Sequence, residues 1–292
     1  PTLHKGGAER LALDICIEMQ KREDVKVKLI ILYPINEYEF LTKQIDVECC
    51  NSKVVPSISG KNQVNLNEFI KIINDFKPDI IHSHLFEAEM LSRWELFPGV
   101  KYFSHCHDNI PQFNNFNLFD FNKKRLTQLY EKKLLFSRYK KCNNHFIAIS
   151  KDSRQFLEQT LYVKFKKNIH FLPNAIEYNR FNVLPKITET LNFINVGSFV
   201  SKKNQNFFIP VAKELIKKGF EFKIILLGDG LLKNEFIAEM KKNQLEKYFE
   251  LPGNINNVED YYAKSKIYIH AALYEPFGLV LLEAMAAGLP VV

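Results

Sequence analysis

The sequence predicts an α/β protein built from two similar domains, each with a parallel sheet and helices on both faces. Its 292 residues exceed what one ordinary domain needs. Short apolar runs alternate with helical patterns, which is typical of βαβ units. The alternation restarts after a polar stretch at residues 179–189. We therefore expect an N-terminal domain over residues 1–185 and a C-terminal domain over residues 186–292.

The first domain is expected to contain short strands separated by amphipathic helices. Leu66, Phe69, Ile70 and Ile73 recur at helical spacing and predict a helix over residues 67–76. The other expected elements are strands at residues 25–32, 78–82, 101–104 and 145–149, and a long helix at residues 122–141.

The second domain repeats this pattern. Its first helix has Phe208, Val211, Ala212, Leu215 and Ile216 on one face and ends before a glycine. The expected strands cover residues 191–196, 222–227 and 266–270, and the expected helices cover residues 205–218, 231–242 and 279–287.

Both ends of the chain look truncated. A strand should precede the Gly6-Gly7 turn, yet only five residues do so. Residues 290–292 resemble the start of a strand that stops short. We therefore expect a first strand and several C-terminal elements to be missing.

Composition and charge narrow the function classes. Hydrophobic residues make up 46% of the chain and charged residues 25%, a globular balance, and no apolar run approaches the roughly 20 residues of a membrane span. The five cysteines are an odd number without C-x-x-C spacing, which favours free thiols over disulfides or zinc. The net charge of +7 favours anionic partners such as nucleotide diphosphates, lipid surfaces or nucleic acid, or reflects only a lysine-rich composition.

Residues 275–283 combine two carboxylates with the predicted start of a helix. Pro276 and Gly278 predict a turn after Glu275, and Glu283 lies in the helix that follows. The first backbone N–H groups of a helix attract anions, so a diphosphate fits between carboxylates that bind sugar and ribose hydroxyls. An ordinary amphipathic helix with an exposed Glu283 is the alternative.

The stretch at residues 275–292 resembles the E-x7-E signature of retaining GT-B-fold glycosyltransferases of group 1. Shorter segments resemble other motifs of that family, in the family's order. They lie at residues 6–10, 79–84, 105–108, 146–150, 172–176, 196–205 and 227–230.

The resemblance implies a GT-B fold with two Rossmann-like domains facing a cleft. It also implies transfer of a sugar from a nucleotide-diphosphate donor, with UDP favoured, to a saccharide or lipid-linked acceptor. The setting would be bacterial polysaccharide or cell-envelope synthesis in the cytoplasm. No cofactor and no metal are implied, because a lysine and helix N–H groups take the place of a cation.

The resemblance also implies roles for individual residues. Glu275, His107 and Lys203 would be catalytic: Glu275 at the donor sugar, His107 near it, and Lys203 at the diphosphate. The residues implied in donor binding are Gly6, Gly7, Asn174, Gly197, Ser198, Lys202, Lys203, Gly228, Gly230, Glu275, Phe277, Gly278, Leu279 and Glu283. Ser198 departs from the family, which usually has an arginine there, and Ala272 and Ala175 are smaller departures.

Several alternatives stay open. His82, His84, His105 and His107, with Asp108 adjacent, could form a metal site, since residues at i and i+2 of a strand share a face. A nucleotide-sugar epimerase and a non-catalytic relative share the expected architecture. No RNA-binding signature accompanies the basic charge, so nucleic acid is not expected as a partner.

One segment suggests a membrane contact. Phenylalanines alternate with polar residues at residues 111–121, and a basic helix follows. An acceptor-side surface against anionic membrane, at the inner face of the plasma membrane, is one interpretation. A packed loop followed by a solvated helix face is the other. The basic residues are Lys123, Lys124, Arg125, Lys132, Lys133, Arg138, Lys140 and Lys141.

Overall fold

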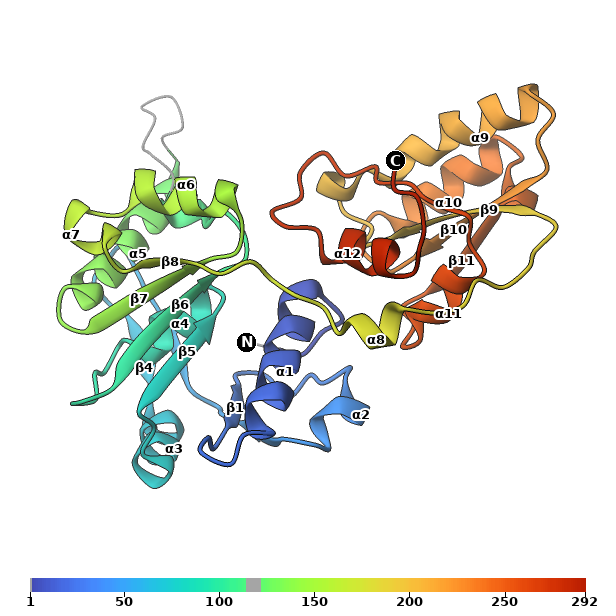
Figure 1. The fold of residues 1–292 in the computed structure, drawn as a ribbon. Coiled ribbons are helices and arrows are strands. Elements are labelled where there is room, and N and C mark those ends of the chain that lie inside the picture. Colours follow the sequence, from blue (N-terminus) through green and yellow to red (C-terminus); the bar gives the residue numbers. More distant parts are fainter. Residues whose placement is uncertain (1, 114–121) are drawn as a thin grey trace. The chain divides into compact units, whose positions relative to one another are not determined.

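The computed structural model describes residues 2–113 and 122–292, which form two compact units (Figure 1). Unit 1 is Pro1–Asn174 and unit 2 is Ala175–Val292. This boundary lies before residue 185, because the short helix α8 (Tyr178–Phe181) belongs to unit 2. The ring of Phe181 is buried there against Tyr262, with the ring centroids 6.1 Å apart.

A four-stranded parallel sheet in the order β5-β6-β7-β8 forms the centre of unit 1. The register aligns His84 at the end of β5 with His105 near the end of β6. The carboxyl ends of these strands therefore bring several histidines to one edge of the sheet. The strands are β5 (Ile80–His84), β6 (Lys101–Cys106), β7 (Asn143–Ala148) and β8 (Ile169–Phe171).

Helices pack against this sheet through apolar faces. Phe69, Ile72 and Ile73 are the buried face of the helix predicted over residues 67–76, and that helix ends at Lys77, which is left-handed and precedes a proline. The helices are α3 (Asn67–Phe76), α4 (Phe86–Ser92), η1 (Pro111–Phe113), α5 (Lys123–Tyr139), α6 (Lys151–Thr160) and α7 (Val163–Lys166). The aromatic segment at residues 114–121 lies outside the described residues.

The N-terminal part of unit 1 has its own small core. Leu13 of the first helix is fully buried with Leu3, Ile31 and Tyr38, and Leu3 forms a parallel bridge with Asn36. The elements are α1 (Gly7–Gln20), β1 (Lys28–Ile31), α2 (Glu39–Thr42) and β2 (Asp46–Cys49), with β1 and β2 parallel, followed by the antiparallel hairpin of β3 (Lys53–Val55) and β4 (Gln63–Asn65).

Unit 2 is a parallel sheet in the order β11-β10-β9-β12 with helices packed against it (Figure 1). Ile194, Ile224 and Ile225 in the two central strands are almost completely buried. The strands are β9 (Leu191–Val196), β10 (Phe222–Leu227), β11 (Phe249–Gly253) and β12 (Ile267–Tyr268). The helices after α8 are η3 (Ser201–Lys203), η4 (Gln205–Phe207), α9 (Phe208–Lys217), α10 (Lys233–Lys242), η5 (Glu246–Tyr248), α11 (Val258–Ala263) and α12 (Leu279–Ala286).

The expected α/β class with two parallel sheets is confirmed, but several elements have other bounds than predicted; the strand expected at residues 25–32, for example, is regular only at Lys28–Ile31. The strand expected at residues 266–270 is regular only at Ile267–Tyr268, although the Ile269 N–H still donates to the Ile194 carbonyl at 2.9 Å. The helix expected from residue 205 begins as a 3-10 turn, because Asn204 before it is left-handed. Within the described ranges, no helix is both long enough and apolar enough to cross a bilayer.

Candidate functional site

Three loops of unit 2 meet at the carboxyl edge of its sheet, where parallel sheets commonly bind ligands. They follow β9, β10 and β12, which lie side by side in the sheet in the order β10-β9-β12. The Leu273 N–H donates to the Lys202 carbonyl at 2.9 Å, and the Asn204 side chain donates to the Ala271 carbonyl at 3.2 Å. These bonds tie the turn that carries Lys202 and Lys203 to the loop that carries Glu275.

Glycines allow the loop after β10 to press against the loop after β9. A Cβ atom at Gly228 would lie 2.3 Å from the Gly197 carbonyl oxygen, and one at Gly230 would lie 2.6 Å from the Phe199 carbonyl oxygen. Both glycines also have positive φ angles, of 133° and 156°. Gly228 and Gly230 therefore fix the shape of the site, and side chains cannot replace them without moving the backbone.

Lys203 and Glu275 form the central ion pair of this site. The Lys203 ammonium group donates to a Glu275 carboxylate oxygen, and each side chain is about one-fifth exposed. The lysine stem lies against Gly197, whose added Cβ would be 3.6 Å from Lys203 Cδ. Gln205 is buried below and donates to the Gly197 and Ser198 carbonyls at 3.2 and 2.8 Å. The ion pair thus joins the loops after β9 and β12, and Gln205 holds the backbone of the loop after β9 through its two hydrogen bonds.

The start of α12 lies directly after Glu275. Gly278 is the residue before the helix and has a φ of 83°. A Cβ there would lie 2.8 Å from Leu281 Cδ1 and 3.2 Å from Glu275 Cγ, so glycine lets the loop close over the helix start. The Leu281 N–H donates to the Gly278 carbonyl at 3.0 Å, whereas the N–H groups of Leu279 and Val280 come too early in the helix to have a partner four residues before them within it. Phe277 is partly buried in the same loop.

Glu283 is held one turn into α12 by a tyrosine. The Tyr262 hydroxyl donates to Glu283 Oε2 at 3.0 Å and lies 3.4 Å from the Val280 carbonyl. Tyr262 is fully buried, and burial together with the Glu283 charge raises its pKa well above the usual value. The hydroxyl therefore keeps its proton and orients the carboxylate.

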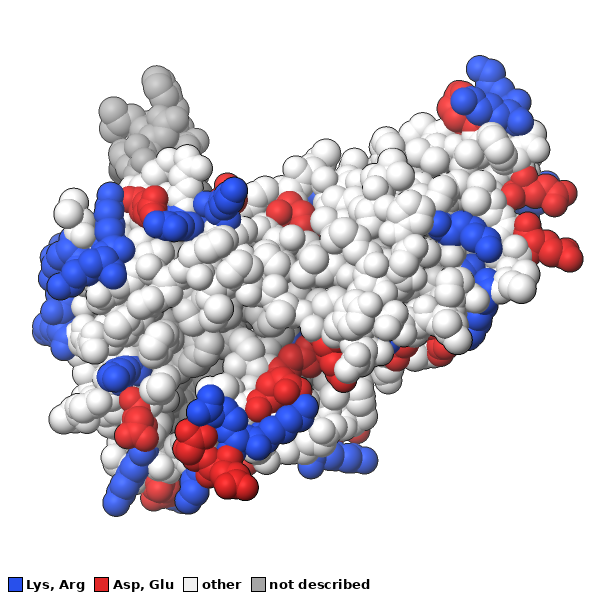
Figure 2. Space-filling model, viewed as in Figure 1, with Lys and Arg blue, Asp and Glu red and all other residues white. Residues whose placement is uncertain are grey.

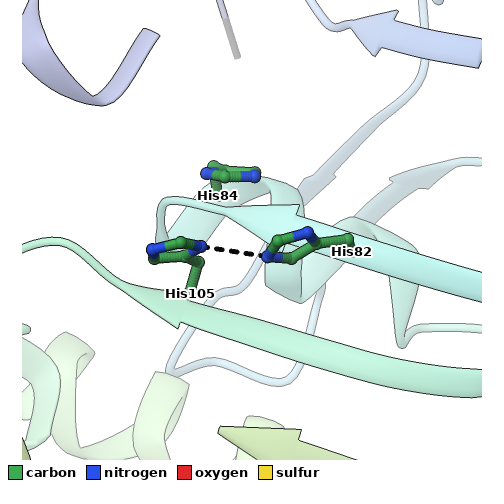
Figure 3. A group of neighbouring side chains, drawn as sticks. All are labelled: His82, His84 and His105. Carbon is green, nitrogen blue, oxygen red and sulfur yellow. Dashed lines mark hydrogen bonds between the residues drawn. The ribbon is translucent and has the colours of Figure 1, made fainter. Parts of the chain in front are cut away.

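Four histidines of unit 1 stack at the ends of β5 and β6. His82 Nε2 lies 3.0 Å from His105 Nδ1, and His84 Nδ1 lies 2.7 Å from His107 Nε2. The rings of His105 and His107 are 4° from parallel, with centroids 4.4 Å apart. Figure 3 shows three of these rings, His82 and His84 from β5 and His105 from β6. The strand register produces this stack, since side chains two apart on each strand share a face.

Burial keeps these imidazoles neutral. It lowers the pKa of His82 and His107 to about 3, and that of His84 well below its usual value, with the neighbouring histidines adding to the effect. Burial lowers the pKa of His105 to about 4, and the Asn174 side chain beside it offsets part of that change. A neutral imidazole donates through one nitrogen and accepts through the other, so in each of the two contacts one ring donates and its partner accepts.

The other expected site residues of unit 1 lie at the start of α1. Gly6 precedes the helix and Gly7 is its first residue. The Tyr38 hydroxyl lies 3.2 Å from both the Gly6 N–H and the Gly6 carbonyl. A Cβ at Gly6 would lie 2.4 Å from a Glu9 carboxylate oxygen, so the glycine accommodates the first-turn glutamate.

The structure therefore gathers the expected residues into separate groups. Gly6, Gly7, His107 and Asn174 belong to unit 1, and His107 and Asn174 both lie at the histidine stack. All the others belong to unit 2 and line its three strand-end loops or the start of α12. Ser198 is exposed in the loop after β9, and Lys202 is exposed on the turn before Lys203.

Sequence patterns missed three residues that shape these groups. Gln205 lies in the segment at residues 196–205 that resembles the family but was given no role, and Tyr262 lies in no motif; their buried contacts reveal what both do. His270 follows β12, where burial lowers its pKa while Glu275 raises it and Lys203 lowers it. A histidine at the end of a predicted strand, five residues before Glu275, was the signal that could have identified it.

Two successive α/β units with parallel sheets and polar strand-end loops are the architecture of the GT-B glycosyltransferases. Family models agree with that class. The model "Glycosyltransferase Family 4" matches residues 5–180, and the model "Glycosyl transferases group 1" matches residues 178–292. The chain belongs to glycosyltransferase family 4.

Curated relatives are distant but extend over much of the chain. EpsF of Bacillus subtilis, a glycosyltransferase by name, is 24% identical over 314 residues, covering 99% of this chain and 76% of EpsF. An Escherichia coli UDP-Gal:alpha-D-GlcNAc-diphosphoundecaprenol alpha-1,3-galactosyltransferase is 24% identical, covering 79% of this chain and 61% of the relative. CapH, a capsular polysaccharide biosynthesis glycosyltransferase of Staphylococcus aureus, is 25% identical, covering 74% of this chain and 59% of CapH.

Solved structures confirm the fold. Anabaena HepE, crystallised with UDP and glucose, superposes with a TM-score of 0.73 at 18% identity, covering 99% of this chain and 77% of HepE. WaaG, a glycosyltransferase involved in lipopolysaccharide biosynthesis, gives a TM-score of 0.68 at 17% identity, covering 100% of this chain and 77% of WaaG. The GT-B fold expected from the sequence is therefore confirmed.

Proposed function

We propose that this protein transfers a sugar from a nucleotide-diphosphate donor, a UDP-sugar, to a saccharide or lipid-linked saccharide acceptor. The transfer retains the anomeric configuration, needs no metal ion and takes place in the cytoplasm during assembly of a bacterial polysaccharide or cell envelope. Family membership supports the reaction class. A galactosyltransferase relative that uses UDP-Gal, and the UDP bound in HepE, support the donor class.

The Lys203–Glu275 ion pair is the observation that carries this proposal. It joins the loops after β9 and β12 next to the start of α12. A donor diphosphate would compete for the Lys203 ammonium and for the first N–H groups of the helix. Glu275, released from the lysine, would then accept hydrogen bonds from the donor sugar. Without donor, the charges of Lys203 and Glu275 therefore offset each other, and in this scheme the diphosphate takes the place of Glu275 beside the Lys203 ammonium.

The chemistry then needs little beyond positioning and charge. The bond between the anomeric carbon and the diphosphate oxygen breaks, and the acceptor oxygen bonds to the same face of that carbon. The acceptor hydroxyl's proton passes to the departing diphosphate. Lys203 and the helix N–H groups stabilise the negative charge of the leaving group, in place of a metal ion. Glu283, held by Tyr262, binds the ribose, and His107 contacts the sugar.

Acceptor-dependent release of UDP tests this function. Purified protein is incubated with UDP-glucose, UDP-galactose and UDP-N-acetylglucosamine, with and without undecaprenyl-diphosphate-linked saccharide and in the presence of chelator. We expect UDP release from one donor only when acceptor is present, with the chelator having no effect. Isomerisation of the donor without acceptor would support an epimerase instead. Binding of UDP without either reaction would support a non-catalytic relative.

A basic end of unit 1 suits an acceptor carried by an anionic membrane. The end of α5 and the start of α7 pack together, with Lys140 Nζ 4.9 Å from the centroid of the Tyr162 ring. Val163, beside them, is 82% exposed. Figure 2 shows lysine and arginine side chains gathered over this end of unit 1. Exposed lysines here are Lys133, Lys140, Lys141, Lys164, Lys166 and Lys167.

Vesicle sedimentation tests the membrane contact. Apolar and basic side chains together favour peripheral binding to anionic lipid. We expect the protein to sediment with phosphatidylglycerol vesicles at low salt and to be released by salt. Replacing Lys140, Lys164 and Lys166 by glutamine should abolish binding, whereas replacing Lys217, Lys218 and Lys241 of unit 2 should not. Equal binding to neutral vesicles would contradict the electrostatic contact.

A further inference from the structure

The histidine stack of unit 1 contains a group with the composition of a metal site. One ring nitrogen each of His82, His84 and His105 lies within 4.8 Å of the others. Figure 3 shows His82 and His105 joined through ring nitrogens, with the His84 ring beside them. His82 and His84 come from β5, and His105 comes from the neighbouring strand β6, where it lies opposite His84. The sheet therefore fixes the spacing of the three side chains.

The distances are close to what a small metal ion requires. Zinc binds histidine nitrogens at about 2.0–2.1 Å in tetrahedral geometry, which places two ligand nitrogens about 3.3 Å apart. His82 Nε2 and His105 Nδ1 are 3.0 Å apart. A metal ion would take the place of the proton they share, and the donating ring would carry its proton on its other nitrogen. The ligand atom of His84 lies within 4.8 Å of the other two and must move closer to them to complete a three-histidine set.

The ligand chemistry selects the kind of ion. Within the described part of the chain, this group holds imidazoles and neither carboxylates nor thiols. Neutral imidazole is a good ligand for zinc, copper and nickel, whereas magnesium and calcium need oxygen ligands. The three rings are largely buried, so they are already stripped of much of their water. The group therefore suits a divalent transition metal ion, and zinc, which is bound by histidine in tetrahedral geometry, is the ion chosen for the test.

His84 connects this group to His107. His84 Nδ1 lies 2.7 Å from His107 Nε2. If His84 binds the ion through Nε2, its Nδ1 must carry a proton, and His107 Nε2 must accept it. If His84 binds through Nδ1, its contact with His107 is lost. An ion at the three histidines therefore either fixes His84 as the donor to His107 or breaks the contact between these two rings.

We propose that His82, His84 and His105 form a binding site for a divalent transition metal ion, zinc above all, and that the ion acts on His107 through His84. Binding of the ion does not depend on the function proposed above. Inhibition of turnover does rest on it, because it requires His107 to contact the sugar. The ion is a regulator in this scheme, and catalysis proceeds without it.

Zinc binding to the whole chain tests the site. Chelator-treated protein is titrated with Zn²⁺ by calorimetry, and its Co²⁺ complex is examined by visible absorption. We expect one ion per chain, with a four-coordinate Co²⁺ spectrum that lacks a thiolate band. His82→Gln should weaken binding by at least about tenfold. His145→Gln is the matched control, because His145 pairs with His170 at 2.9 Å on the same sheet outside the group, and it should leave binding unchanged.

Three outcomes would overturn the site: no stoichiometric binding, binding that survives His82→Gln, or a thiolate band. Ring-nitrogen NMR of the unmodified protein keeps the test valid should the variant misfold. Zinc must then shift the signals of His82, His84 and His105 before those of His145 and His170.

Turnover separates this proposal from the proposed function. We expect zinc to inhibit sugar transfer by wild-type protein, and His82→Gln to keep turnover while losing the inhibition. Zinc binding at the histidines without any transfer would refute the transferase and leave the site standing. Transfer without zinc binding would refute the site alone.

Discussion

Lys203 and Glu275 compensate each other's charge before any ligand binds, and that has a measurable consequence. A carboxylate that only pairs with Lys203 competes with the diphosphate for the Lys203 ammonium. A carboxylate that stabilises the transition state contributes to turnover. Glu275 does both in the proposed mechanism. Removing its charge should therefore affect nucleotide affinity and turnover in opposite directions.

Glu275→Gln is the first prediction. We expect UDP to bind at least as tightly as it does to wild type, because Lys203 loses its competing carboxylate. We expect the rate of sugar transfer to fall by on the order of a hundredfold or more. Calorimetry with UDP and acceptor-dependent UDP release measure the two effects. Glu250→Gln removes an exposed carboxylate paired with Lys264 in the same unit and should change neither quantity. A parallel fall in affinity and rate would assign Glu275 to the fold of the site.

Gly230→Ala is the second prediction, and it concerns backbone. The new Cβ would lie 2.6 Å from the Phe199 carbonyl oxygen, so the loops after β9 and β10 must separate. We expect a loss of unfolding free energy of about 1–3 kcal/mol together with weaker UDP binding. Gly219→Ala is the control, because Gly219 has a φ of 74° but open space around it. It should lower stability and leave UDP binding intact, as urea unfolding and calorimetry would detect.

At the level of elements, α4 carries a buried polar network that the sheet of unit 1 surrounds. Arg93, just after the helix, is fully buried and donates to Asn144 Oδ1 at 2.7 Å and to Ser104 Oγ at 3.0 Å. Glu89 accepts a hydrogen bond from the Tyr139 hydroxyl of α5. Burial raises the pKa of Glu89, while Arg93 and Tyr139 offset part of that change. Arg93 also donates to Ser83 Oγ of β5 at 2.8 Å, so the buried network joins α4, α5 and the strands β5, β6 and β7.

Glu89→Gln is the third prediction. Because the pKa of Glu89 is raised in the folded state, the unfolded chain loses this proton at a lower pH than the folded protein does. The contribution of Glu89 to the unfolding free energy of the wild type is therefore largest below the ordinary glutamate pKa. It decreases as the pH rises towards the pKa of Glu89 in the folded state. Glutamine cannot ionise, so the variant should gain stability relative to wild type between about pH 4.5 and pH 7.

Urea unfolding across that pH range measures the slope. Glu239→Gln is the control of opposite sign, because Asn243 lowers the pKa of this exposed glutamate. The Glu239→Gln variant should lose stability relative to wild type as the pH rises through the usual pKa range of a glutamate. Equal slopes for wild type and Glu89→Gln would show that Glu89 is ionised in the folded protein.

The spacing of apolar residues along the sequence predicted those helices and strands whose apolar residues are the ones buried in the core. The helix at residues 67–76 and the strands at residues 191–196 and 222–227 have the predicted bounds, because their apolar periodicity coincides with burial. The β3–β4 hairpin was not predicted, since its residues are largely exposed and lack an apolar alternation. The strand after residue 266 was overestimated because Ile269 and His270 pair in an irregular conformation.

At the scale of the whole molecule, the order of motifs predicted two α/β units and the family, but it could not predict the contacts within the site. Lys203 meets Glu275 and Tyr262 meets Glu283 only because strand-end loops converge. The histidine stack was visible as two i, i+2 pairs, but the register that aligns His84 with His105 is a tertiary property. The periodicity of a sequence describes one helix or strand at a time, whereas each of these contacts joins residues from two different elements.

The separation of the chain into two units supports a final prediction, on where the donor nucleotide binds. UDP should slow amide hydrogen exchange in unit 2, in the loops at residues 197–204, 228–232 and 270–278 and in the first turn of α12, because diphosphate and ribose contacts order them. Within unit 1, the hairpin of β3 and β4 should be unaffected and serves as the internal control. Mass spectrometry of peptides from the whole chain, with and without saturating UDP, measures the change. Protection confined to unit 1 would contradict the donor site proposed at Lys203 and Glu275, since the nucleotide would then bind away from the only loops that carry this ion pair.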